Sequence, residues 1–425
     1  MKILLYGLNY APEPTGIGKY TGEKAAALAR LGHSVRVVTA PPYYPAWRVS
    51  DGYANRYERT ETPEGVQVWR APLWVPKQPT GLRRVLHLLS FAATSLPVLL
   101  RQWAWRPDVV LVVVPALTCV PGALVLARLS GALAWVHVQD FEVDAAYRLG
   151  LLKGRVPRAL ASGLERWLLR RFDRVSTISH KMMQAAAEKG VEAGRRVFLP
   201  NWVDVAYISP LKGPSPYRDE LGLRSDAVVA LFSGTLAGKQ GLELLPEVAR
   251  RLRVSRPHVV LVICGDGVVK PELQAACAGL DNVRFLPLQP FERLNDLLGM
   301  ADMHLLPQNP GAADVVMPSK LTGMLASGRP VVSTAAPGTE LAHVVSQCGV
   351  VVPPGSAEGM AEAIAQLADD PARRAELGAK ARSYAEQNLA LDGVMRHLDA
   401  ALKQGVASPR DAGALAWRDP HSPAA

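Results

Sequence analysis

The chain has 425 residues, of which 49% are hydrophobic and 20% charged, and this composition excludes a disordered chain, a collagen-like chain and a disulfide-rich secreted module. Its length suggests two or three domains. The net charge of +10 is unevenly spread: residues 1–205 hold 27 basic and 15 acidic side chains (+12), whereas residues 206–425 hold 21 and 23 (−2). This asymmetry indicates two domains, the first of which faces an anionic partner.

The first residues and the cysteines indicate an intracellular protein. The apolar start, residues 1–7, is too short for a signal peptide and is typical of a buried first strand. Because the four cysteines are far apart and form no CxxC pair, we expect buried thiols rather than a disulfide framework, a zinc site or a redox motif. Those cysteines are Cys119, Cys264, Cys277 and Cys348. We therefore expect a cytoplasmic protein.

The uncharged stretch Val109–Ala127 could be mistaken for a membrane span. Pro115, Pro121 and Gly122 interrupt it, and a buried parallel strand over Val109–Val114 followed by a helix over Pro121–Leu129 explains it better.

Short apolar strands alternate with helical patterns along the whole chain, which predicts an α/β protein with two Rossmann-like, doubly wound domains. The expected strands are Lys2–Gly7, Ser34–Thr39, Val66–Arg70, Val109–Val114, Ala134–Gln139, Arg174–Thr177, Val197–Leu199, Val228–Ser233, Val259–Cys264, Val283–Leu286, Met303–Leu306, Val331–Ser333 and Gly349–Val351. The expected helices include Gly18–Leu31, Ala357–Ala368, Pro371–Glu386 and Val394–Lys403.

We place the two domains at residues 1–205 and 206–400, with the Pro- and Gly-rich segment Pro200–Asp226 as their connection. The last helix could pack back on the first domain, and Gln404–Ala425 is predicted to be a flexible tail.

Ligands of such sheets bind at the carboxyl ends of the strands, so the strand-to-helix loops carry the candidate residues. The first loop, Pro12–Lys19, opens a helix whose free N–H groups favour a phosphate or carboxylate, although an ordinary turn is equally compatible. Its spacing is not GxGxxG, which disfavours a dinucleotide site.

A second loop follows the strand that contains His137. Asp140 lies where this strand ends and could orient a substrate hydroxyl or accept a proton. His137 lies in an apolar alternation, so both a core histidine and a catalytic one fit the pattern.

Two further loops predict anion sites in the second domain. Ser233–Gly241 is a Gly-rich loop with Lys239 before the next helix, which suits a diphosphate. Ser319 and Lys320 begin another helix, and Glu340 begins the one after that. Glu340 could accept a hydrogen bond from a ribose or sugar hydroxyl, or merely cap its helix.

Taken together, the chain resembles glycosyltransferase family 4, and more closely its bacterial exopolysaccharide branch of the colanic acid type. The resemblance covers roughly residues 1–400. It is carried by Tyr6–Gly18, His137–Asp140, Leu199–Asp204, Gly234–Gly241, Gly265–Gly267, Met317–Lys320, Ala326–Val332 and Val350–Gly355. The resemblance implies a two-domain GT-B fold, with the acceptor in the first domain and the donor nucleotide mainly in the second.

The resemblance also implies residue roles. Lys239, with Thr235 beside it, looks like the lysine on the donor diphosphate, and Ser319 and Lys320 resemble the start of the phosphate-facing helix. Gly16, Ile17 and Gly18 resemble the loop with which the first domain approaches the donor. Asp140 resembles the acidic residue beneath the transferred sugar, and Gly265, Asp266 and Glu340 are the candidates for the nucleotide and its ribose.

The chain departs from the family pattern at two places. The family's two glutamates, eight positions apart, correspond to Val315 and Gly323, so Glu340 is the candidate for the ribose contact. Thr235 stands where the family frequently has an arginine, directly after Gly234 in the Gly-rich loop that contains Lys239. Lys320 is the candidate for supplying the positive charge that this arginine would bring.

The expected activity is therefore retaining transfer of a sugar from a GDP- or UDP-sugar to a polyprenyl-diphosphate-linked oligosaccharide, without a metal ion or other cofactor. A nucleotide-sugar 2-epimerase and an inactive nucleotide-sugar-binding assembly subunit are the alternatives. Nucleic-acid binding is disfavoured because no reading module is present.

Two basic segments suggest that the protein lies at an anionic membrane, at the inner face of the plasma membrane. Gly81–Arg106 has an apolar middle with arginines on both sides of it and two tryptophans near its C-terminal end. In Arg155–Arg174 the arginines share one helical face, opposite Leu160, Leu164, Trp167 and Leu168. For the first segment, burial between the domains fits the pattern as well as attachment to a membrane. For the second segment, an ordinary solvated face over a core stripe is the simpler interpretation.

Overall fold

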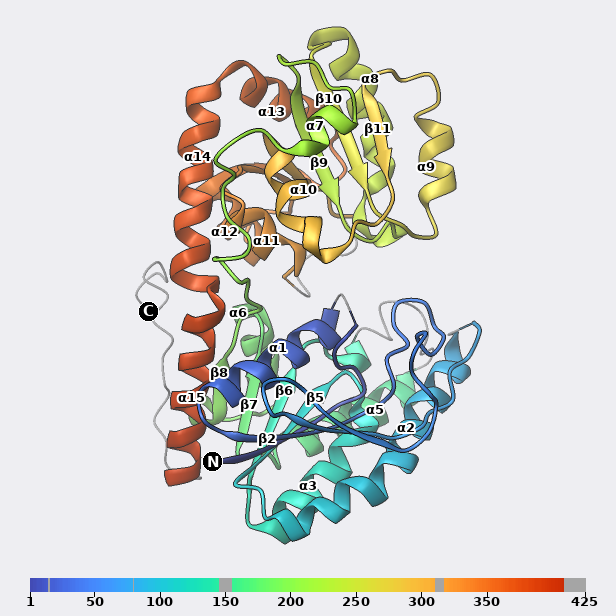
Figure 1. Cartoon of the computed structure of the whole chain (residues 1–425), viewed down its shortest axis with the longest axis vertical. Helices are drawn as coiled ribbons and strands as arrows, with labels where there is room; N and C mark the ends of the chain where they lie inside the picture. The colour runs from blue at the N-terminus through green and yellow to red at the C-terminus, as the bar shows by residue number, and fades with distance from the viewer. Residues whose placement is uncertain (14–15, 79, 145–154, 310–316, 409–425) are drawn as a thin grey trace. The chain divides into compact units, whose positions relative to one another are not determined.

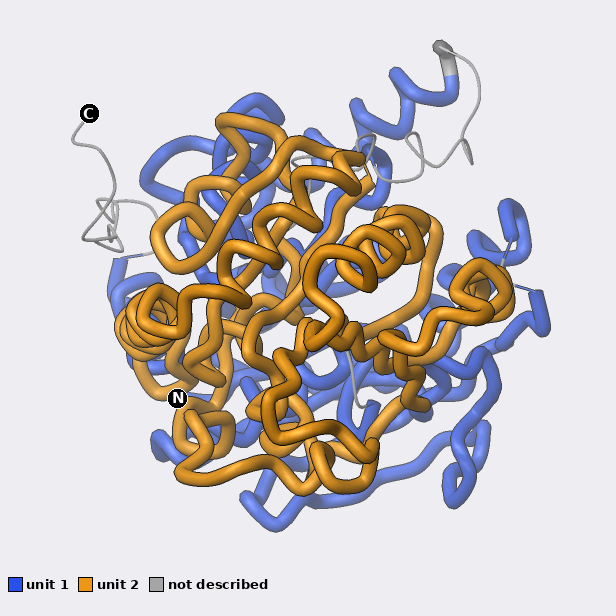
Figure 2. The backbone as a smooth tube through the Cα atoms, turned by 90° about the horizontal axis from the view of Figure 1, so that it is seen from above, with its two compact units in different colours: residues 1–200, 394–425 blue, residues 201–393 orange. Residues whose placement is uncertain are grey.

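The computed structural model describes residues 1–13, 16–78, 80–144, 155–309 and 317–408. The chain divides into two compact units, one formed by residues 1–200 and 394–425 and the other by residues 201–393 (Figure 2). Each unit is an α/β domain with its own sheet and core (Figure 1), which confirms the predicted fold class.

The first unit contains an eight-stranded sheet in the order β3-β4-β2-β1-β5-β6-β7-β8. Its strands are β1 (Lys2–Tyr6), β2 (Ser34–Thr39), β3 (Glu58–Glu61), β4 (Gln67–Arg70), β5 (Val109–Val114), β6 (Leu133–Val138), β7 (Arg174–Thr177) and β8 (Arg196–Phe198). All neighbouring strands pair in parallel except β3, which pairs antiparallel with β4 at the edge. The sequence did not predict β3, because its residues carry charges and no apolar alternation.

The helices of the first unit are α1 (Gly16–Arg30), α2 (Gly81–Arg101), α3 (Val120–Ser130), α5 (Arg155–Leu169), α6 (His180–Glu188) and most of α15 (Leu391–Ala407). One core joins alternate side chains of the central strands, such as Tyr6 and Val112, to Phe91 of α2 and Leu126 of α3. Burial of both faces explains why β5 is continuously apolar. The interpretation of Val109–Ala127 as strand, turn and helix is therefore confirmed.

The second unit contains a six-stranded parallel sheet in the order β11-β10-β9-β12-β13-β14. Its strands are β9 (Val228–Ser233), β10 (Val259–Cys264), β11 (Val283–Leu286), β12 (Met303–Leu306), β13 (Val331–Thr334) and β14 (Gly349–Val352). Its helices are α7 (Pro216–Glu220), α8 (Leu245–Ser255), α9 (Lys270–Ala276), α10 (Leu294–Met300), α11 (Lys320–Ala326), α12 (Glu340–Cys348), α13 (Ala357–Asp369) and α14 (Pro371–Tyr384).

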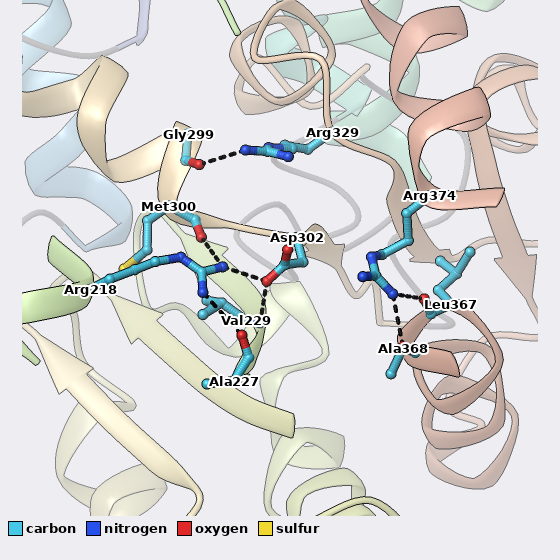
Figure 3. A network of polar contacts seen from close by, with 10 residues as sticks. All are labelled: Arg218, Ala227, Val229, Gly299, Met300, Asp302, Arg329, Leu367, Ala368 and Arg374. Atoms are coloured by element: carbon cyan, nitrogen blue, oxygen red, sulfur yellow. Dashed lines mark hydrogen bonds and ion pairs between the residues drawn. The ribbon is translucent and has the colours of Figure 1, made fainter. Parts of the chain in front are cut away.

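An arginine network stabilises the amino-terminal edge of this second sheet (Figure 3). Arg218 of α7 donates to Asp302 at 2.6 Å, and Asp302 also accepts from the backbone N–H of Val229 at the start of β9. Arg329 and Arg374 donate to nearby backbone carbonyls. The segment that we expected to be a connection therefore contributes α7 to the second unit, and the units part between Pro200 and Asn201.

The last helix returns to the first unit. Asp399 of α15 accepts from Nε2 of His33 at 2.8 Å, and Gly405 lies so close to Leu133 that a Cβ atom would have to displace that side chain. The helix continues through Ala407, so the predicted tail begins four residues too early; residues 409–425 lie outside the described part of the chain.

One helical stretch in the described chain, residues 81–105, is long and apolar enough to cross a membrane by length and composition alone. One face of α2 belongs to the core through Phe91, Ser95 and Leu99. The four cysteines are buried and free, as predicted.

Candidate active site

Two glycine loops meet backbone to backbone at the carboxyl end of the second sheet. Leu236 N donates to the carbonyl of Asp266 at 2.8 Å, and Gly234 N donates to that of Cys264 at 3.0 Å. A Cβ atom at Gly265 would overlap the carbonyl oxygen of Gly234, and Gly265 has a φ of 149°. Only glycine permits this approach, which brings the loops after β9 and β10 into one surface of backbone groups.

Lys320 lies beside these loops, at the start of α11. Its Nζ donates to Oε1 of Gln240 at 2.6 Å and lies 4.0 Å from the ring centroid of Phe232. Burial of the ammonium lowers the pKa of Lys320 to about 7. In the described part of the chain, no carboxylate lies within ion-pair distance of Lys320. A buried cation without a counter-ion is costly, and a bound anion would relieve that cost.

The other candidates for the donor phosphates lie in the same region of the fold. Lys239 is in a short 3-10 turn, Gly238–Gln240, directly after the β9 loop. Thr235 is exposed on that loop, and Ser319 is exposed at the N-cap position of α11. The Lys320–Gln240 hydrogen bond thus brings together the two predicted anion-binding loops of the second domain, the one with Lys239 and the one with Ser319.

The nucleotide candidates divide into two groups. Gly265 belongs to the backbone surface, whereas Asp266 is exposed and lies 3.6 Å from Lys270. Glu340 is the first residue of α12, but the helix cap is Thr339, whose hydroxyl accepts from Ala342 N. Glu340 is therefore not needed as the cap. Of the two positions where the family carries glutamates, Gly323 lies within α11 and Val315 lies outside the described residues.

In the first unit, a buried glutamate supports the loop that leads to α1. Glu13 accepts hydrogen bonds from the backbone N–H groups of Tyr43 and Tyr44, both at 3.1 Å, and from Asn9 at 2.9 Å. Its carboxylate occupies the space where a Cβ of Gly18 would lie. Burial raises the pKa of Glu13, although these bonds oppose the rise.

Gly16 begins α1 with a φ of 62°, and Thr21 donates to the carbonyl of Ile17. Beneath this loop, Arg70 of β4 donates to the carbonyls of Ala11 and Ala40. The loops after β1 and β2 are therefore held together by buried side chains, not by an ordinary turn alone.

Asp140 lies directly after β6, beside a second carboxyl group. Burial, together with Glu165 and Asp140 nearby, raises the pKa of Glu142 to about 7, although Arg84 and the N–H of Leu117 oppose the rise. Glu142 accepts from that N–H at 2.5 Å. Asp144, in the helical turn that follows, forms an ion pair with Nζ of Lys189 at 2.9 Å. The segment that follows Asp140 is thus held by the N–H of Leu117 and by Lys189.

His137 is a core histidine in this structure. It is fully buried, its Nδ1 lies 2.9 Å from the hydroxyl of Ser176 and its Nε2 lies 2.9 Å from the amide nitrogen of Gln139. Burial holds the pKa of His137 well below its usual range. Its surroundings are therefore those of a core histidine, which is the first of the two alternatives that the sequence left open.

Sequence reasoning missed Glu13 and Glu142. Each is explained by partners distant in sequence, Tyr43 and Tyr44 for Glu13 and Leu117 for Glu142. The only available signal was an acidic residue within an otherwise apolar or Gly-rich loop. Among the described residues, no group of three or more His, Cys, Asp and Glu side chains is arranged to hold a metal ion.

Comparison with known proteins agrees with this architecture. Residues 15–202 match the family "Glycosyl transferase 4-like domain", and residues 215–384 match "Glycosyl transferases group 1". The chain is 46% identical over 405 residues to the putative colanic acid biosynthesis glycosyl transferase WcaI of Escherichia coli, covering 93% of this chain and 98% of that protein.

Solved structures share the fold. Sucrose-phosphate synthase from Thermosynechococcus elongatus superposes with a TM-score of 0.75 at 17% identity, covering 96% of this chain and 99% of that one. Anabaena HepE in complex with UDP-glucose has a TM-score of 0.65 at 17% identity, covering 95% and 99%. With both halves matched and a relative aligned over nearly its whole length, the chain belongs to glycosyltransferase family 4 and is a glycosyltransferase of the GT-B fold.

Proposed function

We propose that this enzyme transfers a sugar from a nucleotide diphosphate sugar to a polyprenyl-diphosphate-linked oligosaccharide during exopolysaccharide assembly of the colanic acid type. The similarity to WcaI over nearly the whole chain supports the pathway class. The complex of HepE with UDP-glucose, in a protein of the same fold, supports a nucleotide sugar as donor. The donor base is GDP or UDP in this proposal.

Lys320 is the observation that carries the proposal. Its ammonium is desolvated, bonded to a neutral amide oxygen and not within 4.0 Å of any carboxylate in the described chain. At Gly234 and Gly265 the two loops beside it offer backbone groups without a side chain. A diphosphate supplies the negative charge that this arrangement lacks.

The proposed chemistry follows from that charge. As the anomeric C–O bond breaks, negative charge grows on the leaving diphosphate, and Lys320 and Lys239 stabilise it where water is excluded. Transfer is proposed to retain the anomeric configuration without a metal ion. Asp140 positions the sugar or the acceptor, and His137 supports the strand that carries it.

The remaining roles are proposals from the resemblance. Ser319 and Thr235 contact the diphosphate, and so does the loop of Gly16, Ile17 and Gly18. Gly265, Asp266 and Glu340 contact the nucleoside. The second unit binds the donor, and the first unit binds the acceptor.

Exposed apolar side chains on two helices support a peripheral position at the inner face of the plasma membrane. In α2 they are Leu82, Val85, Leu86 and Leu89, and in α5 they are Leu160, Leu164 and Trp167. We name these seven residues the apolar patch. For α5 the simpler interpretation of a core stripe holds only at the end of the helix: of Leu160, Leu164, Trp167 and Leu168 only Leu168 is buried, together with the adjacent Leu169.

Basic side chains accompany the apolar patch. Arg83 of α2 and Arg158 and Arg166 of α5 are exposed. Both helices adjoin the loop of Asp140, because Arg84 of α2 and Glu165 of α5 each interact electrostatically with Glu142. Apolar side chains would enter the headgroup region while arginines attract anionic lipid, each by about 1 kcal/mol. A lipid-linked acceptor would then be delivered beside the loop.

The test is a transfer assay with radiolabelled nucleotide sugars and a lipid extract from an exopolysaccharide-producing strain. A panel of GDP- and UDP-sugars is first screened for thermal stabilisation of the protein, and each stabilising donor is incubated with and without the extract. We expect label in the lipid fraction only when both are present.

Two controls separate the alternatives. Donor alone should be recovered with unchanged stereochemistry, since a 2-epimerase would release the epimer without an acceptor. Lys239→Ala should sharply reduce turnover and donor binding without unfolding the protein. Stabilisation by a donor without transfer to any lipid fraction would contradict the proposal and favour a binding subunit.

A further inference from the structure

A cluster of aromatic rings lies at the carboxyl end of the first sheet, and none of these rings has a role in the proposed chemistry. Tyr43 and Trp47 come from the loop after β2, and His87 comes from α2. The ring centroids are 5.5 Å apart for Tyr43 and Trp47, 4.8 Å for Tyr43 and His87, and 5.3 Å for Trp47 and His87. Tyr43 and His87 are buried, whereas Trp47 is partly exposed. The cluster therefore presents one ring to its surroundings.

His87 has an unused hydrogen-bonding atom in this cluster. Its Nδ1 lies 2.6 Å from the carbonyl oxygen of Trp74, and because a carbonyl only accepts, Nδ1 carries the proton. Burial lowers the pKa of His87 and keeps the ring neutral, so Nε2 is an acceptor. His87 is 1% exposed, and Nε2 has no hydrogen-bond partner among the described residues. A buried acceptor of this kind costs free energy until a donor reaches it. Because Nε2 has less than 1 Å² of accessible surface, a donor reaches it only when the side chains that cover it shift.

The backbone of Trp47 is also unusual. Its φ of 53° lies in the left-handed region, which bulky residues rarely adopt. Such strain persists only where the surroundings enforce it, and it concentrates at functional positions. Here the contacts of the indole with Tyr43 and His87 hold it in place.

The cluster adjoins the candidate active site of the same unit. Tyr43 N donates to Glu13, which supports the Gly16–Gly18 loop. Arg84 interacts electrostatically with Tyr43 and His87, and also with Glu142 beside Asp140. Two more aromatic side chains are exposed nearby in sequence, Tyr44 at 39% and Trp74 at 45%.

We propose that this cluster is a carbohydrate subsite in which a pyranose ring of the acceptor stacks on Trp47 and donates one hydroxyl to Nε2 of His87. An aromatic face suits the C–H face of a pyranose, and a few placed polar groups then fix its orientation. The subsite rests on the proposed function, because it assigns the sugar portion of the acceptor to this unit.

The test measures sugar binding without transfer. The full chain is titrated with methyl α-glucoside, methyl β-galactoside and methyl α-fucoside and followed by saturation-transfer NMR. We expect at least one glycoside to bind saturably. Trp47→Leu should weaken it by about tenfold, which corresponds to about 1.4 kcal/mol.

A second variant tests the histidine. His87→Asn keeps an N–H donor near the position of Nδ1 but removes Nε2, so we expect several-fold weaker sugar binding with an unchanged near-UV circular dichroism spectrum. Trp103→Leu is the matched control, since Trp103 is 55% exposed and lies outside the cluster. It should bind the glycosides as the unaltered chain does.

Three results would overturn the subsite: no glycoside binds, Trp47→Leu binds as well as the unaltered chain, or Trp47→Leu loses only its affinity for phosphatidylglycerol vesicles. The last result would place Trp47 at the membrane instead. Nucleotide-sugar stabilisation is measured in parallel. If glycosides bind but no nucleotide sugar stabilises the protein, the proposed donor chemistry is contradicted. If a nucleotide sugar stabilises the protein but no glycoside binds, only the subsite is contradicted.

Discussion

The ammonium of Lys320 donates to the amide oxygen of Gln240 across 2.6 Å, and this bond joins the start of α11 to the loop after β9. The partner is neutral, so the lysine is held in position without losing its charge to an ion pair. The ring of Phe232 lies against the same ammonium, 4.0 Å from its centroid. Lys320 is thereby positioned for an anion before any ligand arrives.

Replacing Lys320 with Met should weaken donor binding and lower kcat further, because the interaction strengthens as charge builds on the leaving group. We expect kcat/KM to fall by about 100-fold or more, in line with the loss of one electrostatic stabiliser. The protein should melt at the same or a higher temperature, since a buried unpaired charge is removed. An unchanged kcat would exclude Lys320 from the leaving-group site.

The depressed pKa of Lys320, about 7 against about 10.4 in an unfolded chain, predicts a pH-dependent donor affinity. Diphosphate favours the charged lysine, so affinity should be greatest below pH 7 and should fall by up to about tenfold per pH unit above it. Isothermal titration between pH 6 and 9 measures this slope. Lys320→Arg keeps its charge throughout and should abolish the slope, whereas an identical slope would assign it to another group.

The close approach of the two glycine loops predicts that Gly265→Ala is severely destabilising. The new Cβ would overlap the carbonyl of Gly234, and the positive φ adds about 1–2 kcal/mol of strain. Gly279→Ala is the matched control, because Gly279 also has a positive φ but no atom within 4 Å of the added Cβ. Urea unfolding should show a clearly larger loss for Gly265→Ala; equal losses would mean that the loops separate freely.

The pairing of His33 with Asp399 predicts acid-sensitive docking of α15. Burial raises the pKa of Asp399, but hydrogen bonds from Lys403 and His33 outweigh it and the net pKa is lowered. A lowered carboxyl pKa adds stability above its unfolded value of about 3.9, and this stability is lost as pH falls through the folded value.

Asp399→Asn should therefore lower the free energy of unfolding by about 1 kcal/mol at pH 7 and by little once the pH has fallen below the folded pKa of Asp399. Lys403→Met is the control, because it removes the solvent-exposed ion pair of Asp399 with Lys403, whose side chain is 61% exposed. It should lower the free energy of unfolding much less than Asp399→Asn does. Thermal melts across this pH range provide the measurement. A cost for Asp399→Asn that does not depend on pH would point to packing instead.

Membrane attachment through the apolar patch predicts that Leu160→Asp with Leu164→Asp reduces flotation with vesicles containing phosphatidylglycerol. Both side chains are more than half exposed, so the fold should tolerate the change. Val254→Asp places the same chemistry on an exposed position of the second unit and should leave flotation intact. Raising the salt concentration should also release the unaltered protein. Equal flotation of both variants would exclude α5 as an anchor.

The buried strands could be predicted from the sequence nearly to the residue, because a strand covered on both faces must be apolar throughout. β5, β9, β10 and β12 begin and end where expected. β3 was missed because it is exposed at the edge and held by backbone pairing with β4 rather than by apolar burial. On α5 the helical periodicity was read correctly, but periodicity alone does not tell which face meets the core.

The candidate site could be predicted only where local pattern determines chemistry. Glycine loops with a lysine, as around Lys239 and Lys320, are visible in the sequence because a phosphate site is built from neighbouring backbone groups. The side chains that support the loops of the first unit are not visible in the sequence in this way. Glu13 accepts hydrogen bonds from Tyr43 and Tyr44, and His137 is hydrogen-bonded to Ser176. Which residues become partners depends on the order of the strands in the sheet. The sequence shows that strands and helices alternate, but it does not show this order.

The return of α15 to the first unit has a consequence for synthesis on the ribosome. That unit lacks its last helix until residues 394–407 have emerged, which is after the whole of residues 201–393. At 5–20 residues per second, the delay is roughly 10–40 s. Throughout this interval His33 and Leu133 remain without the helix that covers them, while the second unit already has all its residues. The unit that begins the chain is therefore the last to be completed.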